Sequence, residues 1–362
     1  MIMRRNATLK EVAKACGVTA QTASRILNSP LSNLYRKETV ELVTKKAEEL
    51  GYRLNTFAQS VRNGKFHCIS MLVSPEIEFS SFPLEFLIGI QTQLVKSGYN
   101  LMFNVLPKNA SVAEKELPRI FRENLVDGAI VAITHAIPEW LESLIKSINV
   151  PIVWIGSKHE SDCVNHNDFG AAYQITKRFI NDGHQKICYA DFAIPENLKE
   201  QIHFSVYERM KGYSKAIEEA GLEKYIARPS HMLNKMETVS FAEQKIVREI
   251  KPSAVLCYDL PFCGRPIIYA FCRNGISVPN DVSLAVFTNE NVPENGLDIA
   301  RFSPNSSEII KTATTFLLKK ISDPETTNAP AVIPFSFYEG NSLAKAKVAK
   351  NQTYIEPAEK RF

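Results

Sequence analysis

The sequence predicts an α/β protein in which a small helical module precedes a larger body of two parallel sheets flanked by helices. Residues 8–28 read as two short helices separated by a tight turn, which is a helix-turn-helix pattern. From residue 68 onward, apolar strands alternate with amphipathic helices, as is typical of parallel sheets covered on both faces. The charge divides at the same place, because residues 1–65 hold 12 Lys and Arg against 5 Asp and Glu, whereas the remainder holds 31 against 34.

The N-terminal segment carries the local signals of two capped helices. Thr8 and Glu11 have the spacing of a capping box, in which each side chain bonds the backbone amide of the other residue. Gly17 predicts the turn, because a residue without a Cβ reaches positive φ without strain, and Thr19 can cap the second helix. That helix carries side chains suited to bases and phosphates, namely Gln21, Thr22, Ser24 and Arg25. The pattern predicts a helix that enters the DNA major groove, with an ordinary helical hairpin as the alternative.

The body repeats one scheme in its two halves. Strands are predicted at 68–74, 101–106, 128–133 and 151–156 in the first half, and at 186–190, 254–258 and 282–287 in the second. Helices are predicted near 82–97, 111–124, 138–148, 168–182, 207–220, 241–250 and 264–274. We therefore expect two sheets in tandem, which form two lobes with a ligand cleft at the carboxyl ends of their strands.

Further motifs extend the pattern on both sides of the first sheet. After the helix-turn-helix come an apolar helix at residues 39–52 and the segment NTFAQSVR at residues 55–62. In the body, GHQKI begins at Gly183, RMKGYSKA at Arg209 and GISVPNDVS at Gly275. Together these segments resemble the lactose-repressor/galactose-repressor family of bacterial transcription regulators over about residues 7–343.

The resemblance implies a domain organisation and a function. It implies a DNA-binding headpiece at 1–54, a hinge helix or linker at 55–66, and a two-lobed, periplasmic-binding-protein-like body at 67–343 that binds an effector and dimerises; 344–362 is a polar tail. The protein is then a transcription regulator, a repressor of carbohydrate metabolism whose operator is an inverted repeat of double-stranded DNA. The tail lacks the leucine heptads on which the family's tetramers rely, so a homodimer is expected.

The resemblance also assigns the DNA-binding residues. Gln21 matches a position that reads bases, where its amide can pair with adenine, although a solvated surface residue is the alternative. Ser24 can serve packing or capping instead. In the hinge, Val61 matches a leucine that wedges into the minor groove, and Ala58 matches the small residue between two hinge helices. The full set is Thr8, Leu9, Thr19, Ala20, Gln21, Thr22, Ser24, Arg25, Asn28, Thr39, Tyr52, Asn55, Ala58 and Val61.

The effector site is assigned in the same way. Arg209 matches an arginine that grips sugar hydroxyls or carboxylates, with a surface ion pair as the alternative. His166, Tyr258 and Thr288 stand where the family has polar or acidic groups, so the cleft has lost negative charge. A sugar acid or a sugar phosphate is therefore expected in preference to a neutral sugar, unless there is no effector. The expected site residues are Phe79, Trp154, His166, Arg209, Tyr258, Asp259 and Thr288, with core packing as the alternative for Trp154.

Other classes of protein find little support. The seven cysteines are scattered without a C-x-x-C pair, so we expect reduced, buried thiols and neither disulfides nor a metal site. We find no signal peptide, no membrane-spanning segment, no nucleotide-binding loop and no catalytic motif, so a cytoplasmic protein without cofactor or enzymatic activity is expected. His184 is interpreted as a structural residue at the junction of the lobes. The alternatives are a regulator controlled by a protein partner or by none, and a cytosolic two-lobed solute-binding protein or enzyme, against which the headpiece argues.

Overall fold

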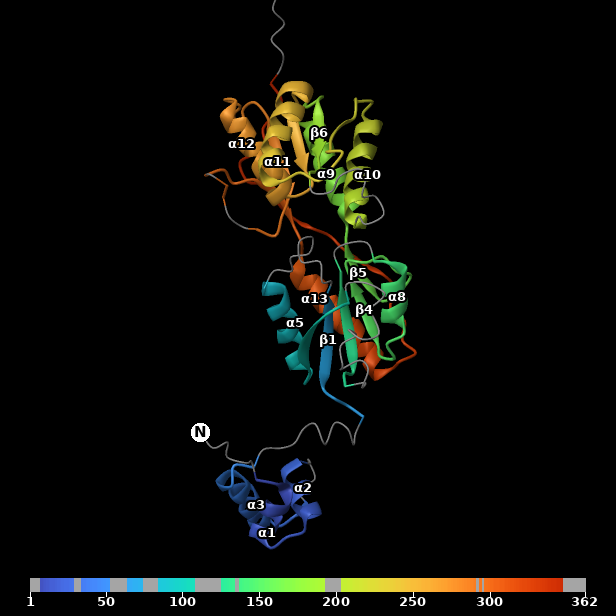
Figure 1. The fold of residues 1–362 in the computed structure, drawn as a ribbon, viewed down its shortest axis with the longest axis vertical. Helices are drawn as coiled ribbons and strands as arrows, with labels where there is room; N and C mark the ends of the chain where they lie inside the picture. Colours follow the sequence, from blue (N-terminus) through green and yellow to red (C-terminus); the bar gives the residue numbers. More distant parts are fainter. Residues whose placement is uncertain are drawn as a thin grey trace, which may run out of the picture. The chain divides into compact units, whose positions relative to one another are not determined.

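The protein folds as two units, Met1–Phe66 and His67–Phe362. The computed structural model describes residues 7–28, 34–52, 64–73, 84–107, 125–133, 137–192, 203–290, 293–294 and 296–347. The first unit contains α1 (Leu9–Cys16), α2 (Ala20–Asn28) and α3 (Lys37–Glu49), and the second contains two six-stranded sheets (Figure 1). The predicted α/β class, with a helix-turn-helix before a two-lobed body, is therefore confirmed.

Caps fix the ends of the first two helices. The Oγ1 atom of Thr8 accepts a hydrogen bond from the amide of Glu11 at 3.3 Å, and the Glu11 carboxylate accepts one from the amide of Thr8 at 2.6 Å. Gly17 ends α1 with φ 65°. Thr19 then begins α2, because its Oγ1 accepts a hydrogen bond from the amide of Thr22 at 3.1 Å. Both predicted caps and the predicted glycine turn are thus present.

One small core holds the three helices of the headpiece together. It consists of Val12, Ala13, Ala23, Ile26, Val43 and Ala47. Leu50 is 42% exposed because it lies at the C-terminal cap of α3. Arg36 stands at the N-cap of α3 and makes no side-chain capping bond. The orientation of α2 therefore depends on the buried alanines and on its own Thr19 cap.

The first sheet of the body forms lobe 1. Its strands are β1 (Cys68–Val73), β2 (Asn100–Val105), β3 (Gly128–Ala132), β4 (Ile152–Ile155), β5 (Cys163–His166) and β11 (Ala331–Ile333), in the order β11-β5-β4-β3-β1-β2, all parallel. Helices α5 (Leu84–Lys96) and α13 (Ser306–Ser322) pack on one face, and α8 (Glu139–Lys146) packs on the other. Both faces of the sheet are thereby covered, as a parallel sheet requires.

The second sheet forms lobe 2. Its strands are β6 (Ile187–Ala190), β7 (Tyr225–Ala227), β8 (Ala254–Cys257), β9 (Ser283–Phe287), β10 (Ala300–Ser303) and β12 (Ser336–Tyr338), in the order β12-β10-β9-β8-β6-β7, with β12 antiparallel to β10. Helices α9 (Asp168–Asn181) and α10 (Phe204–Glu219) cover one face. The other face carries α11 (Lys235–Phe241), the π-helices η4 (Ala242–Ile250) and η5 (Leu260–Gly264), and α12 (Arg265–Arg273).

The two sheets are not built from separate halves of the chain. The chain crosses between the lobes after β5, after β10 and after β11. The late helix α13 therefore lies beside the early helix α5 on lobe 1 (Figure 1), where a Cβ at Gly89 would stand 2.6 Å from the Cδ1 atom of Ile310. The expectation of two sheets in strict tandem is wrong, because α13 and β11 return to complete the first sheet.

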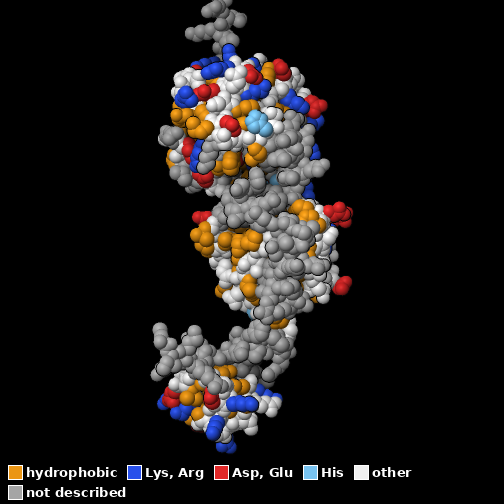
Figure 2. Space-filling view, viewed as in Figure 1, with side chains coloured by type: hydrophobic (Ala, Val, Ile, Leu, Met, Phe, Trp, Pro, Cys, Tyr) orange, Lys and Arg blue, Asp and Glu red, His pale blue; other side chains and the backbone are white. Residues whose placement is uncertain are grey.

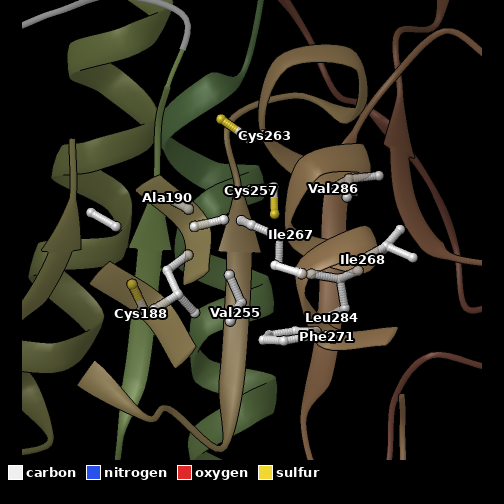
Figure 3. Packing of buried hydrophobic residues seen from close by; sticks show 14 of the residues in the cluster. Cys188, Ala190, Val255, Cys257, Cys263, Ile267, Ile268, Phe271, Leu284 and Val286 are labelled. Carbon is white, nitrogen blue, oxygen red and sulfur yellow. The ribbon is translucent and has the colours of Figure 1, made fainter. Parts of the chain in front are cut away.

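The cysteines belong mainly to hydrophobic cores. Figure 3 shows Cys188 and Cys257 on neighbouring strands of lobe 2, packed with Cys263 among aliphatic side chains. Burial raises the pKa of Cys188 to about 12, so this thiol stays protonated. All seven cysteines are free, but only four are buried as expected, because Cys16 and Cys68 are half-buried and Cys272 is exposed. Within the described residues, no helix combines the length and the apolar character that crossing a bilayer requires.

Candidate DNA-binding and effector sites

The exposed face of α2 carries the side chains expected to read DNA. Gln21 and Arg25 are exposed one helical turn apart, whereas Ala23 and Ile26 are buried on the face that packs against the headpiece core. Gln21 offers an amide acceptor and two amide donors, and Arg25 offers a fork of donors. A helix with this face free can place both side chains against base edges or phosphates.

The other expected DNA-binding residues lie around this helix. The hydroxyls of Thr19 and Thr22 bond each other at 2.9 Å, so these two side chains stabilise the start of α2. Tyr52 packs against the headpiece core, and its burial raises the pKa of its hydroxyl. Thr8 is exposed, the side chains of Leu9, Ala20, Ser24 and Thr39 are half-buried, and Asn28 is the last residue of α2. Asn55, Ala58 and Val61 lie outside the described residues.

In the body, Arg209 is the centre of a buried polar cluster. Its Nε atom donates to Asp168 Oδ1 at 2.7 Å, and its Nη1 atom donates to the carbonyl oxygen of Tyr258 at 2.7 Å. The guanidinium stacks over the ring of Phe287 at 3.9 Å from the ring centroid and lies 5.5 Å from that of Phe335. The side chains of Arg209 and Asp168 are only 13% and 4% exposed. The cation is therefore neutralised and held in a fixed plane.

His166 belongs to the same cluster and lies at the end of β5, where the chain leaves lobe 1. Its ring packs against Phe335, on another crossover, with the ring centroids 4.7 Å apart. Burial lowers the pKa of His166 to about 4, and the Asp168 carboxylate opposes this shift only in part. Among the described residues, its Nε2 atom has no hydrogen-bond partner. The imidazole is thus neutral near pH 7 and retains unused hydrogen-bonding capacity.

Three expected residues follow the carboxyl ends of β8 and β9. Tyr258 bonds the Ser205 hydroxyl through its own hydroxyl at 3.0 Å, and burial raises its pKa to about 12. The Asp259 carboxylate accepts the amides of Phe262 and Cys263 at 3.1 and 2.9 Å and so caps η5; burial raises its pKa to about 6.

Thr288 accepts the amide of Glu290 through its hydroxyl at 3.0 Å. The side chains of Asp259 and Thr288 are therefore committed to their own backbone.

Trp154 was also expected at the site but lies elsewhere in lobe 1. The ring of Trp154 is 6% exposed and packs in the core of lobe 1, with its centroid 4.1 Å from that of His159. Phe79 lies outside the described residues. Three residues that were not among the predicted site residues, Asp168, Phe287 and Phe335, contact Arg209. Asp168 could have been recognised as a candidate because it begins the predicted helix 168–182. No local sequence pattern indicated a role for Phe335.

Comparisons with known proteins identify related domains at both ends of the chain. Residues 8–55 match the family described as bacterial regulatory proteins, lacI family, and residues 176–343 match the periplasmic binding protein-like domain. The repressor PurR of Photobacterium profundum is 26% identical over 332 residues, which cover 88% of this chain and 92% of PurR. The repressor PurR of Vibrio parahaemolyticus is 28% identical over 335 residues, with 88% and 93% covered.

Solved structures share the fold. The lac repressor dimer bound to operator and the anti-inducer ONPF is 17% identical with a TM-score of 0.77, covering 94% of this chain and 100% of that one. The regulator CelR in complex with cellobiose is 20% identical with a TM-score of 0.63, covering 93% and 99%. A helix-turn-helix joined to a two-lobed body of this kind defines a DNA-binding transcriptional repressor rather than an enzyme. The chain therefore carries a lacI-family domain at residues 8–55, followed by a periplasmic binding protein-like domain at residues 176–343.

The lowered pKa of His166 predicts a pH dependence of stability. The unfolded chain binds a proton near the ordinary pKa of 6.5, whereas the folded chain binds it only near 4. The contribution of the neutral His166 to the free energy of unfolding is therefore fully present above pH 6.5 and is lost as the pH falls through 4. We expect wild type to lose stability relative to His166→Phe over this interval, as measured by urea unfolding at a series of pH values.

The comparison of the two proteins removes a competing effect. The raised pKa of Asp259 acts with the opposite sign, because its contribution is present at low pH and lost as the pH rises through 6, but both proteins carry it. His231→Asn, at an exposed histidine, serves as the control. A constant difference between wild type and His166→Phe from about pH 7 to about pH 4 would contradict the buried neutral imidazole.

Proposed function

We propose that the protein is a cytoplasmic, homodimeric repressor that reads an inverted-repeat operator with α2 and responds to a small molecule bound beside Arg209. DNA binding is supported by the exposed side chains of Gln21 and Arg25, which lie on a helix whose N-terminus is capped by Thr19. A symmetric dimer presents two such helices, which fit half-sites about one helical turn apart. The operator can be identified by selection of bound duplexes from random DNA.

Replacement of Gln21 tests the base-reading role. Gln21→Ala should weaken binding to the selected operator by about 1–3 kcal/mol and relax selectivity at one base position, because a bidentate contact is lost. Arg25→Ala should weaken binding and flatten its salt dependence if the guanidinium contacts phosphate. Both are measured by fluorescence anisotropy over a salt titration.

A matched control is available on α1. Lys10→Ala removes an exposed cation from the headpiece without touching α2. Gln21→Ala that binds all single-base variants of the operator with unchanged ratios would rule out base reading by this residue. Equal affinity of wild type for operator and random duplex would rule out specific recognition altogether.

An exposed apolar face of lobe 1 supports the dimer. Leu84, Ile88 and Val95 form a stripe along α5 and are 66%, 55% and 55% exposed. The neighbouring strand β2 is an edge of the sheet and exposes Phe103 and Val105. Figure 2 shows hydrophobic side chains gathered on this side of lobe 1. A contiguous apolar face of this kind is typical of an association surface, and the solved lac repressor is a dimer.

Charge on this stripe should separate the dimer. Ile88→Glu is expected to yield monomers in sedimentation velocity and to weaken operator binding, because two half-sites are then bound independently. Val332→Glu, at a 60% exposed position on the opposite edge strand β11, is the control and should remain dimeric. A dimeric Ile88→Glu protein, or a monomeric wild type at operator saturation, would refute the proposed interface.

The proposed effector site is the cluster around Arg209. Asp168 opposes the charge of Arg209, and the nearby imidazole of His166 has an Nε2 atom without a hydrogen-bond partner among the described residues. These groups suit an oxygen-rich ligand such as a sugar derivative. We propose a sugar acid or a sugar phosphate in particular, because a guanidinium binds anionic oxygen strongly. Solved relatives contain cellobiose or ribose.

A thermal-shift screen tests the effector. Sugar acids or sugar phosphates should raise the melting temperature of wild type, and the shift should be lost in Arg209→Lys, which keeps the charge but not the planar fork. Stabilisation by neutral sugars alone would contradict an anionic effector and indicate a neutral one. The absence of any shift in wild type would favour the alternative, a regulator controlled by a protein partner or by concentration alone.

A further inference from the structure

The two lobes contact each other directly at a place that the effector cluster does not include. The turn after β4 of lobe 1 lies against the N-terminus of α10 of lobe 2. The Nε2 atom of His203 lies 2.7 Å from the carbonyl oxygen of Gly156, and the Nζ atom of Lys158 lies 3.1 Å from Glu208 Oε1. We call these four residues the interlobe latch. The covalent crossovers connect the lobes, whereas the latch binds one lobe to the other without a covalent link.

The hydrogen bond of His203 has a defined direction. Its Nδ1 atom accepts the backbone amide of Ser205 at 3.3 Å, so that the imidazole caps the N-terminus of α10. A nitrogen that accepts carries no proton, so the proton of the neutral ring lies on Nε2. Nε2 therefore donates to the carbonyl oxygen of Gly156. One ring thus caps a helix of lobe 2 and binds the backbone of lobe 1.

The partner on lobe 1 is held just as firmly. Gly156 has φ 73°, a conformation that favours glycine, and its amide donates to the carbonyl of Val164 at 3.2 Å. A Cβ at this position would stand 3.1 Å from the carbonyl oxygen of Ile133. The turn therefore has little freedom to adjust, and its carbonyl stays directed at His203.

The ion pair of the latch contributes less. Lys158 is 55% exposed, and exposed ion pairs stabilise weakly because solvent screens them. Its ammonium also lies 5.1 Å from the ring centroid of Phe204, the first residue of α10. The hydrogen bond of His203 is therefore the main contact, and Lys158 adds a second point that prevents rotation about it.

The latch is connected to the effector cluster through one hydroxyl. Ser205 Oγ lies 2.7 Å from Nδ1 of His203 and 3.0 Å from the hydroxyl of Tyr258. The carbonyl of Tyr258 in turn accepts from Arg209. A ligand that moves the Tyr258 ring changes the hydrogen bond that orients His203, and hence the contact with Gly156. Resting on the proposed function, we propose that this latch stabilises one arrangement of the two lobes and thereby sets the operator affinity of the protein.

The experiment cuts the latch without removing the helix cap. His203→Asn keeps a side-chain acceptor for the α10 N-terminus but is too short to reach Gly156, and it is combined with Lys158→Ala. The matched control is Lys211→Ala, because Lys211 pairs with the same Glu208 at 3.7 Å but lies on α10 itself. Hydrogen exchange by mass spectrometry and operator affinity are measured on the full chain without added ligand.

The proposal predicts two changes in the double variant and neither in the control. Amides of 156–161 and 203–208 should exchange roughly fivefold faster or more, and operator affinity should change by roughly fivefold or more. Exchange equal to that of the control would refute the latch. Faster exchange with unchanged operator affinity would refute its regulatory role. Failure of wild type to bind any operator would instead count against the proposed function, because the exchange measurement does not depend on DNA.

Discussion

The body of the protein depends on the neutralisation of one buried cation. Arg209 cannot be removed from water unless its charge is paired and its donors are used. Asp168 supplies the charge from the start of α9, and the backbone of Tyr258 supplies an acceptor from the end of β8. Phe287 and Phe335 add aromatic faces from β9 and from the last crossover. The side chain of Arg209 on α10 thereby contacts α9, the ends of β8 and β9, and the connection between β11 and β12. A change in the arrangement of the lobes must preserve or replace these contacts.

Local sequence patterns predicted the elements better than their assembly. The long apolar strands β1, β3, β8 and β9 were located because every residue in them is apolar or small, as burial on both faces requires. Strands β7, β11 and β12 are three residues long and half-exposed, so they give no such signal. Helix α13 was not among the predicted helices, and no local pattern indicates that this segment returns to lobe 1. The packing of α13 on lobe 1 depends on contacts between residues that are distant in sequence, such as Ile310 and Gly89.

The candidate sites divide in the same way. The exposed positions of Gln21 and Arg25 could be predicted from sequence, because helical periodicity alone separates the exposed face of α2 from the buried one. The partners of Arg209 could not be predicted in this way, because Asp168 and Tyr258 are distant from it in sequence and meet it only in the folded protein. His184 was expected at the junction of the lobes, but it lies at the amino-terminal end of β6. There it bonds Ser253 at 3.0 Å and the carbonyl of Ala344 at 2.9 Å, at the opposite edge of the sheet from the cluster.

The polar contacts of the body suggest how binding and lobe arrangement are coupled. Only three chain segments connect the lobes, and such segments can act as hinges. The relative orientation of the lobes then depends on the non-covalent contacts between them. Ser205 joins two such sets, since its hydroxyl touches both His203 and Tyr258. A ligand at the cluster can alter the arrangement only by its difference in affinity for the two states. The same difference must then appear in DNA binding, because coupling between two sites is reciprocal. A shared hydroxyl of this kind lets a modest change at one site reach the other without a large movement of either lobe's core.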